Sequence, residues 1–342
     1  MKILGSVFGL FFLSTITFTG QITLHKVSDE LIFNAPPFAS CHASTIVEVT
    51  PDKFMSAAFG GTGEGNKDVC IWLSTKENGE WGKPVKMADG IINDTLRYPC
   101  WNPVLFKAKE GKLFLFYKVG PSPGTWWGMV RTSTNDGKTW TSPERLPEGI
   151  LGPIKDKPVQ LSNGTILSPS SSETKESNWK AHIEKSTDLG KTWQFIPVDL
   201  KTEFSIIQPT ILIHPNNKLQ ILCRSKSNVI LQAYSEDNGD SWGAFTKTEL
   251  PNPNSGIDAV TLKNGWHLLV YNPTIQGRGG RAKLNVAISK DGIKWSDAAI
   301  LENEEQGEFS YPAVIQANDG KIHITYTYRR VNVKHVVLEE TK

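Results

Sequence analysis

One short motif recurs along this chain and limits what the chain can fold into. Residues 186–193 read STDLGKTW, and close copies stand at 133–140 (STNDGKTW) and 235–242 (SEDNGDSW). A shorter copy, SKDGIKW, occupies 289–295, and STKENGEW at 74–81 is a degraded version. The closing tryptophans follow one another at intervals of 49 to 59 residues. A period in this range indicates an architecture built from repeated units.

Each copy has the composition of a tight turn. Asp or Asn side chains hydrogen-bond nearby backbone N–H groups, and glycine adopts the positive φ that such turns need. We expect the tryptophan to fill the gap between neighbouring sheets. The motifs are therefore interpreted as scaffold and not as catalytic residues.

A second repeat follows the motifs after about fifteen to twenty residues and consists of a polar residue, then Pro or Ala, at the start of a strand-like run. The six segments are 42–45, 102–105, 157–160, 208–211, 258–261 and 311–314. Six repeats of roughly 50 residues, each with room for four short strands, predict an all-β fold, a six-bladed β-propeller. Two β-sandwiches in tandem are the alternative, but they would not give six-fold self-similarity. Five motifs are visible because the ring has to close, and we expect a strand around 21–33 to complete the blade formed by the C-terminal strands.

The first twenty residues, MKILGSVFGLFFLSTITFTG, have the form of a secretory signal peptide. The alternative is a buried N-terminal strand. We therefore expect 1–20 to be a signal peptide and 21–342 to be a single propeller domain. The signal peptide predicts that the protein is secreted or periplasmic, and we expect no membrane insertion after its removal.

Charge and cysteine content exclude several classes of partner. The formal net charge of +2 gives no case for nucleic acid. The spacing of Cys41, Cys70, Cys100 and Cys223 matches no zinc pattern. Buried free thiols are the favoured state, and a single disulfide bond is the alternative. No phosphate-binding loop, dinucleotide fingerprint or metal motif is found, so we expect no cofactor, no metal and a monomer.

In a propeller the first strand of every blade lines the central channel, so one repeated position should collect polar residues around one axis. The residues are His42, Asn102, Lys157, Gln208, Asp258 and Tyr311. We interpret this set as a functional mouth. His42 titrates near neutral pH and could act as acid or base, and Asp258 could activate a nucleophile or water. Trp126 and Trp127, in a Gly- and Pro-rich segment, could stack on sugar rings or pack between blades.

The repeated motif is the Asp-box, and with six blades and a polar mouth the chain resembles the sialidase (neuraminidase) superfamily over nearly the whole of residues 21–342. The resemblance implies an arginine triad for a substrate carboxylate, a Tyr nucleophile paired with a Glu, and an Asp acid/base. Tyr suits this chemistry because the anomeric carbon bears a carboxylate, which would repel an anionic nucleophile.

The family motifs place individual roles on this chain. FSYPAV corresponds to the segment of the nucleophile, which implies Tyr311. The stretch RAKL implies Arg281 as the third arginine, with Arg278 as a rival, and LCRS implies Arg224 as the second. The segment AAFGGTGEGNKDV offers Asp68 as acid/base, with Glu64 second.

Two positions depart from the family pattern. His42 stands where the first arginine is usual, and Gln208 stands where the Glu that activates the tyrosine is usual. Gln cannot take a proton, so Tyr311 would lack its base. Lys157 and Arg97 are further cations that could bind a carboxylate.

The favoured function is therefore an exported sialidase-like glycoside hydrolase that removes a terminal acidic sugar, either sialic acid or a related keto-deoxy or uronic acid. Asp68 would protonate the leaving oxygen, and Tyr311 would act at the anomeric centre. Two alternatives stay open. One is a lyase acting on uronic acid glycans with His42 or Tyr311 as base, and the other is a propeller that binds glycans without catalysis.

Overall fold

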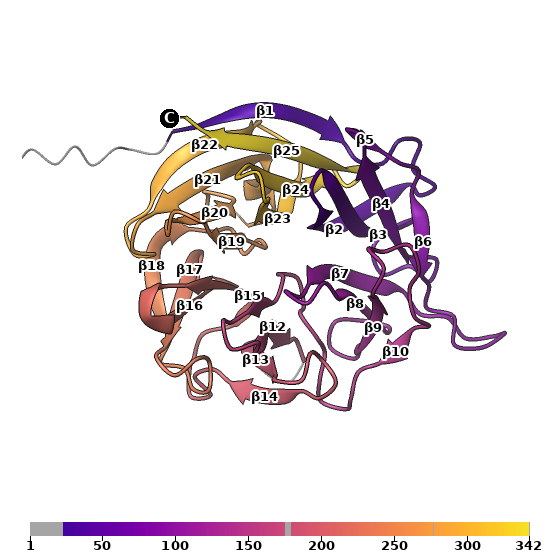
Figure 1. Cartoon of the computed structure of the whole chain (residues 1–342), viewed down its shortest axis with the longest axis horizontal. Coiled ribbons are helices and arrows are strands. Elements are labelled where there is room, and N and C mark those ends of the chain that lie inside the picture. Colours follow the sequence, from indigo (N-terminus) through magenta and orange to yellow (C-terminus); the bar gives the residue numbers. More distant parts are fainter. Residues whose placement is uncertain (1–22, 175–178, 276, 342) are drawn as a thin grey trace, which may run out of the picture.

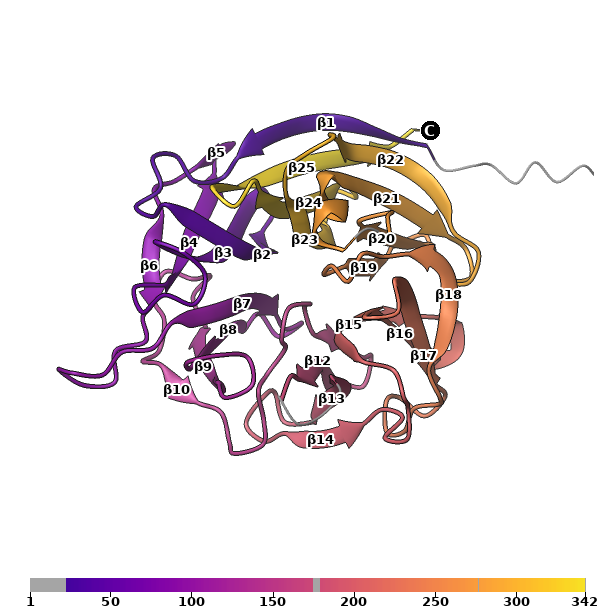
Figure 2. The same ribbon diagram turned by 180° about the vertical axis from the view of Figure 1, so that it is seen from behind.

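Six β-sheets surround a central axis in this chain, as the predicted propeller requires (Figure 1). The computed structural model describes residues 23–174, 179–275 and 277–341. The predicted signal peptide at 1–20 lies outside the described residues. Figure 2 shows the same ring from behind, with the first strands of the blades nearest the axis.

The blades follow one another along the chain, and within each the strands run outward from the axis. Blade 1 holds β2 (Ser40–Thr50), β3 (Lys53–Gly61), β4 (Cys70–Glu77), β5 (Glu80–Trp81) and β6 (Val85–Ala88). Blade 2 holds β7 (Cys100–Lys107), β8 (Leu113–Val119), β9 (Trp127–Ser133) and β10 (Glu144–Arg145). Blade 3 holds β11 (Val159–Gln160), β12 (Ile166–Ser172), β13 (Lys180–Ser186) and β14 (Gln194–Pro197).

The second half of the ring repeats this arrangement. Blade 4 holds β15 (Ile206–Ile213), β16 (Leu219–Ser225), β17 (Val229–Ser235) and β18 (Thr246–Pro251). Blade 5 holds β19 (Asp258–Thr261), β20 (His267–Tyr271), β21 (Lys283–Ser289) and β22 (Ser296–Asn303). Blade 6 holds β23 (Phe309–Gln316), β24 (Ile322–Tyr328), β25 (Asn332–Glu340) and β1 (Leu24–Leu31). Two short 3₁₀-helices, η1 (Pro215–Asn217) and η2 (Arg278–Ala282), lie in connections.

The two ends of the described chain close the ring. Strand β1 pairs antiparallel with β25 and so becomes the outermost strand of blade 6. The predicted closure by a strand around 21–33 is thereby confirmed. Pairing the N-terminal strand with the last blade leaves no break in the circle of sheets (Figure 1).

The core lies between neighbouring blades rather than within one sheet. All seven residues of β8 are buried, because blades cover both faces of this strand. Leu105 and Leu115 of blade 2 join Ile71 and Leu73 of blade 1 in one apolar cluster. Each sheet therefore supplies two apolar faces, which explains the continuous hydrophobic runs in the second strands.

The Asp-box turns have the hydrogen bonds that their composition predicts. Asp188 Oδ1 accepts from the N–H groups of Lys191 and Thr192 at 3.0 and 2.9 Å. The side-chain hydrogen bond from Thr192 helps to lower the pKa of Asp188 to about 2. Trp193 closes the turn and meets Phe116 of the preceding blade edge-on, with ring centroids 6.1 Å apart. The interpretation of these motifs as scaffold is consistent with this packing.

The turn glycines pack directly on the preceding blade. Gly190 has φ +80°, and a Cβ there would lie 2.9 Å from Cε1 of Phe114 on β8. Gly239 stands in the same relation to Leu167 on β12, at 2.8 Å. Glycine is thus required both for the backbone conformation and for the close approach of two blades.

All four cysteines are buried and free, which confirms the favoured thiol state. Within the described parts of the chain, we find no helix that combines the length and the apolar character needed to cross a bilayer.

The first prediction concerns the seam between blades 2 and 3. Gly190→Ala and Gly164→Ala place a methyl group on backbones with nearly equal positive φ, +80° and +87°, but only Gly190 faces a neighbouring ring. We expect Gly164→Ala to lower the free energy of unfolding by about 1–2 kcal/mol from backbone strain alone. Overpacking against Phe114 should add about 1–3 kcal/mol in Gly190→Ala.

Thermal or urea unfolding of the two variants measures this difference. Equal destabilisation would show that the Asp-box turn contributes nothing to the contact between blades.

Candidate active site

The hairpins nearest the axis share one register, which identifies the residues that lie at equal height. In every blade the first strand pairs a residue with the one six positions later. The first-strand residues are Glu48, Lys107, Gln160, Ile213, Thr261 and Gln316. Five positions before each of them stand Ala43, Asn102, Lys155, Gln208, Gly256 and Tyr311. We call these six residues the axial layer.

Three of the six predicted mouth residues belong to the axial layer: Asn102, Gln208 and Tyr311. The prediction was wrong by one position for His42 and by two positions for Lys157 and Asp258. In blades 2, 4 and 6 a Pro directly follows the axial-layer residue, but in blades 3 and 5 the similar Pro158 and Ala259 stand two positions later. The distance from the hairpin therefore identifies the axial layer better than the Pro or Ala does. Ala43 and the three correctly predicted residues have positive φ, from +38° to +56°, where the strand pairing shifts register.

Lys157 and Asp258 form an ion pair below the axial layer. Lys157 Nζ lies 3.0 and 2.9 Å from the two carboxylate oxygens of Asp258. Asp258 also accepts from Thr210 Oγ1 at 2.9 Å and from the N–H of Val314 at 2.8 Å. The carboxylate is buried and fully engaged, so the structure contradicts its predicted role as a base.

Lys155 fills the axis directly beneath Tyr311. Its ammonium donates to the carbonyls of Ile257 and Pro312 at 2.7 and 2.6 Å, and it lies 6.0 Å from the centroid of the Tyr311 ring. A Cβ on Gly256 would lie 2.8 Å from Lys155 Cε and 3.3 Å from Tyr311 Cδ2. The lysine and the tyrosine therefore occupy the space that a side chain at Gly256 would need.

Tyr311 presents its hydroxyl group to two donors. The phenol oxygen accepts from Arg224 Nη1 at 2.8 Å and from Gln208 Nε2 at 3.3 Å. The ring lies 4.1 Å from the imidazole of His42, and the backbone has φ +53°. A strained tyrosine held between hydrogen-bond donors is typical of a functional position.

Arg224 is a buried cation with no carboxylate within ion-pair distance among the described residues. Its side-chain partners are the oxygens of Gln208, Asn254 and Tyr311, all of which belong to neutral groups. The residue is 6% exposed. A buried guanidinium without an anion is unfavourable, so this arrangement favours binding of an anionic ligand.

Arg281 also lies beside the Tyr311 ring. The guanidinium carbons of Arg224 and Arg281 are each 5.7 Å from the ring centroid. Arg281 Nη1 lies 2.9 Å from Glu308, and its Nη2 donates to the carbonyl of Asn254 at 3.3 Å. The structure thus brings both predicted arginines to Tyr311; the side chain of Arg278 lies outside the described residues.

A third arginine, missed by the sequence analysis, reaches this cluster from the β24–β25 turn. Arg330 Nε lies 3.0 Å from Glu308, and Nη1 lies 2.6 Å from Glu64. Its backbone carbonyl accepts from the N–H of Cys41 at 2.8 Å. Arg330 is therefore anchored beside His42, the position where an arginine was expected.

One sequence signal could have revealed this arginine. Arg329 and Arg330 are the central residues of a β-turn within a three-residue hairpin connection, with φ +52° and +62°. Turn positions with positive φ favour Asn and Gly. Two consecutive arginines there indicate a strained backbone, which is typical of a functional site.

His42 is buried and hydrogen-bonded to Thr327 Oγ1 at 2.8 Å. Burial lowers its pKa well below the usual range, and the charges of Arg330, Arg281 and Arg224 lower it further. The lowered pKa favours the neutral imidazole, which has no imidazolium proton to donate. It therefore argues against the predicted role of His42 as an acid, whereas its role as a base stays a prediction.

The rim of the site carries carboxyl groups from two loops. Asp68 lies in the β3–β4 loop and accepts from the N–H and hydroxyl groups of Thr62 at 2.8 and 2.9 Å. The same loop is tied to the cluster through Glu64 and Arg330.

Glu173, which follows β12, is a carboxyl group that the sequence analysis missed. Burial raises its pKa, although Arg224 and Lys226 act in the opposite direction, and Glu64 raises it further. No motif marks Glu173 in the sequence. Its interaction with the charges of Arg224 and Glu64 places it at this rim.

Three further predicted residues, Arg97, Trp126 and Trp127, support the structure around the site. Arg97 Nη2 donates to the carbonyl of Asp68 at 3.3 Å, and so supports the β3–β4 loop. Trp126 is buried against Trp101, while Trp127 packs on Tyr98 and under Arg145 in the seam between blades 1 and 2. The packing alternative therefore holds for both tryptophans.

Trp179 is the aromatic residue that lies at the arginine cluster. Lys226 Nζ is 4.1 Å and the Arg224 guanidinium 5.7 Å from its ring. The side chain is partly exposed. A ring held in this way offers a surface on which a sugar could stack.

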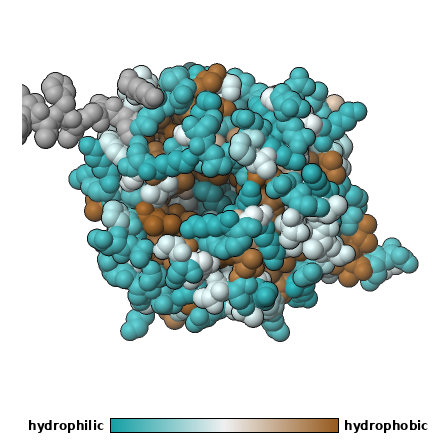
Figure 3. Space-filling view, viewed as in Figure 1, coloured by the Kyte–Doolittle hydropathy of each residue, from teal (hydrophilic) through white to brown (hydrophobic). Residues whose placement is uncertain are grey.

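The axis is hollowed at the centre of one face of the ring (Figure 3). The described residues include no group of three or more His, Cys, Asp or Glu side chains placed to hold a metal ion.

Comparisons with known proteins agree with this geometry. Residues 52–324 match the model of the BNR repeat-like domain family. An anhydrosialidase from Macrobdella decora is 22% identical over 246 residues, which cover 62% of this chain and 31% of that protein. A sialidase from Bacteroides fragilis is 23% identical over 234 residues, covering 61% and 42%. The chain thus spans less than half the length of these relatives.

A solved structure shows the same fold. The NanB sialidase from Streptococcus pneumoniae superposes with a TM-score of 0.72 over 91% of this chain and 70% of that chain, at 12% sequence identity. The likeness extends over all the blades and so confirms the predicted six-bladed architecture.

The second prediction concerns Glu308, whose carboxylate joins Arg281 and Arg330. Burial alone would raise the pKa of Glu308. The hydrogen bond and charge of Arg330 and the charge of Arg281 outweigh burial, so the pKa lies below the usual range. Its stabilisation is therefore present above about pH 4.3, the unfolded value, and is lost as the pH falls through the folded pKa. Glu308→Gln should lower the free energy of unfolding at pH 7 by about 1–3 kcal/mol.

Thermal unfolding at pH 7 and in steps below pH 4 measures this effect. The difference between the wild type and Glu308→Gln should narrow in acid. Glu304→Gln, at an exposed residue 4.0 Å from Arg329, is the control and should change little. A gap that stays constant with pH would contradict the proposed ionic role of Glu308.

Proposed function

Because this chain belongs to the BNR repeat-like family, and because three arginines converge beside Tyr311, we propose that it is a sialidase-like glycoside hydrolase that removes a terminal carboxylate-bearing sugar from a glycan. The two relatives, the anhydrosialidase from Macrobdella decora and the sialidase from Bacteroides fragilis, support a sialic acid or a related acidic sugar as the substrate.

The observation that carries this proposal is that buried Arg224 has no carboxylate within ion-pair distance among the described residues. Arg281 and Arg330 both pair with Glu308, and Arg330 pairs with Glu64 as well, but Nε of Arg281 has no hydrogen-bond partner among the described residues. A sugar carboxylate between the three guanidiniums would neutralise Arg224 and accept hydrogen bonds in pairs. Binding would place the carbon that bears this carboxylate next to Tyr311, since Arg224 and Arg281 both lie beside the tyrosine ring.

Tyr311 would act at the anomeric carbon. Its oxygen already accepts a hydrogen bond from Arg224, which would stabilise negative charge that develops there during attack. No acceptor among the described residues contacts this oxygen, because Gln208 turns its NH₂ group toward it. The phenol proton therefore has to leave through substrate or water, and we expect slow turnover.

The leaving group needs a proton donor from the rim. Asp68 stands in the family position, but Thr62 occupies both of its oxygens. Glu173 is a second candidate, because burial and the neighbouring Glu64 favour its protonated form. We propose that Asp68 donates the proton and that Glu173 keeps a proton available at the same rim.

The N-terminal segment 1–20 supports export, and the glycan would then be met outside the cytoplasm. A lyase reaction has less support, because its proposed base His42 is buried and surrounded by arginines. Gln208 favours one other function, glycan binding without turnover, since it removes the base from the site.

One experiment separates these functions. The full chain is incubated with sialosides and with uronate-bearing oligosaccharides, and the products are analysed by mass. A product that has gained water supports the hydrolase, and an unsaturated product supports the lyase. Saturable binding without any product supports the binding function.

The third prediction tests the new arginine against its neighbour. Arg330→Ala should raise KM for an acidic glycan by at least tenfold, because charge-assisted hydrogen bonds to a carboxylate are each worth about 1.5–3 kcal/mol. Arg329→Ala is the matched control. The Arg329 side chain is about half exposed, lies over Phe309 and Tyr328 and faces Glu304 instead of the Glu308 carboxylate, so KM should change less than twofold.

Steady-state kinetics, or binding of the free acidic sugar if turnover is too slow, gives both values. Equal effects of the two substitutions would remove Arg330 from the substrate site.

The fourth prediction restores the missing base. Gln208→Glu places a carboxylate where the amide now lies 3.3 Å from the Tyr311 oxygen and 3.2 Å from Arg224. We expect kcat to rise by roughly 100-fold, the lower end of what general base catalysis contributes. KM should rise too, because the new carboxylate competes with the substrate for Arg224.

Gln208→Met controls for loss of the amide without gain of a base, and it should not raise kcat. If Gln208→Glu leaves kcat unchanged, proton removal from Tyr311 does not limit the reaction.

A further inference from the structure

Asn254 contacts both of the arginines that lie beside Tyr311. It belongs to the connection between β18 and β19, two residues before Gly256 of the axial layer, and it is half-buried. Its Oδ1 accepts from Arg224 Nε at 3.0 Å. Its carbonyl oxygen accepts from Nη2 of Arg224 and, at 3.3 Å, from Nη2 of Arg281. One backbone oxygen therefore holds two guanidinium groups close together.

This shared oxygen leaves one donor on each arginine for a ligand. Each Nη2 carries two N–H groups but has a single acceptor among the described residues. The two Nη2 atoms cannot be farther apart than the sum of their hydrogen bonds to the same oxygen. A carboxylate, which carries two oxygens on one carbon, matches such a pair of donors.

The turn around Asn254 keeps its carbonyl in position. Asn252 Oδ1 accepts from the N–H of Ser255 at 2.8 Å, and both of these residues are fully buried. Asn254 itself has φ +57°, a conformation that Asn adopts more readily than most residues with a Cβ. The oxygen that binds both arginines thus belongs to a well-anchored part of the chain.

Asn254 provides these hydrogen bonds without providing a charge. Arg281 pairs with Glu308 at 2.9 Å, whereas Arg224 has no carboxylate within ion-pair distance among the described residues, and Glu173 acts on it from farther away. Asp has nearly the size and shape of Asn and also adopts positive φ, so a carboxylate at position 254 would fit and would pair with Arg224. The amide instead leaves the charge of Arg224 to a ligand.

We propose that Asn254 determines the preference of the mouth for an anionic sugar, because it holds Arg224 and Arg281 together through neutral acceptors. The inference rests on the proposed hydrolase function and names a residue that selects its class of substrate. A sugar carboxylate would accept one N–H from each arginine, whereas a neutral sugar would leave Arg224 buried without an anion. Asn254 acts through the arginines and is therefore a positioning residue.

Asn254→Asp tests this role. The full chain is titrated at pH 7 with N-acetylneuraminic acid and with glucuronic acid, each compared with its own methyl ester, and binding is followed by ligand-observed NMR. We expect the wild type to bind at least one acid at least tenfold more tightly than its ester. Asn254→Asp should bind that acid at least tenfold more weakly than the wild type does, while binding of the ester changes less than threefold.

The same variant has a readout that does not depend on a ligand. The new carboxylate should pair with Arg224, so Asn254→Asp should unfold at a higher temperature than the wild type at pH 7. A loss of acid binding together with a gain in stability is not expected from mere damage to the fold.

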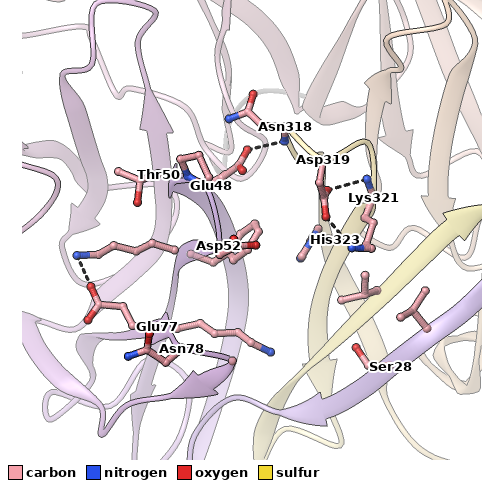
Figure 4. A pocket seen from close by; sticks show the side chains of 17 residues that line it. Ser28, Glu48, Thr50, Asp52, Glu77, Asn78, Asn318, Asp319, Lys321 and His323 are labelled. Atoms are coloured by element: carbon pink, nitrogen blue, oxygen red, sulfur yellow. Dashed lines mark hydrogen bonds and ion pairs between the residues drawn. The ribbon is translucent and has the colours of Figure 1, made fainter.

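Two variants serve as controls. Asn254→Gly keeps the carbonyl and the positive φ but removes Oδ1 without adding charge, so the ratio of acid to ester affinity should stay within threefold of the wild type. Asn78→Asp makes the same substitution at an exposed residue with φ +52° and should leave the ratio unchanged. Asn78 lies in the β4–β5 turn, on the wall of a separate pocket in the seam of blades 6 and 1 (Figure 4).

Four outcomes would overturn this role of Asn254 alone. They are an unchanged ratio in Asn254→Asp, an equal loss in Asn254→Gly, an equal loss in Asn78→Asp, and a lower unfolding temperature of Asn254→Asp. A wild type that prefers neither acid over its ester would overturn the proposed function as well, so the two failures are told apart.

Discussion

The first strand of each blade faces the axis with one unpaired edge, and the ring depends on how the N–H groups of these edges find acceptors. Side chains of the neighbouring blade supply them. The bonds run from Leu105 to Thr45, from Gln208 to Ser171, from Ala259 to Thr210 and from Val314 to Asp258. An edge strand left open would expose or bury unsatisfied donors, and both are unfavourable. Adjacent blades are therefore joined by polar contacts at the axis and by apolar packing farther out.

This polar axis explains why charged groups can be buried here. Lys155 and Lys157 each donate to backbone carbonyls of another blade, so their charges replace strand-to-strand hydrogen bonds. The same support holds Tyr311 and Gln208 in backbone conformations with positive φ. Contacts deeper in the axis thus hold Tyr311 and Gln208 in their strained backbone conformations, and they give these side chains a rigid support.

The fold could be predicted because its signals are local and repeated. Each Asp-box needs only its own turn residues, and six copies of a strand pattern leave few architectures. The axial layer was harder to predict, since it depends on strand register, and Pro158 suggested the wrong one in blade 3. Arg330 and Glu173 could not be found from spacing, because each reaches the site from a segment that no family motif marks. The lowered pKa of His42 could not be predicted, because its burial beside three cations is a property of the assembled ring.

The turn that carries Arg330 has a consequence for the order in which the molecule assembles. It joins β24 to β25, and β25 becomes an inner strand only when β1 pairs with it. Two arginines of the cluster belong to blades 4 and 5, whereas the third arrives with the blade that both chain termini complete. Arg330 crosses the seam to blade 1 through its own contacts, since its Nη1 lies 2.6 Å from Glu64 and its carbonyl accepts from the N–H of Cys41. A ring that opens between blades 6 and 1 would free this arginine from Glu64, so closure of the circle also positions the third cation of the mouth.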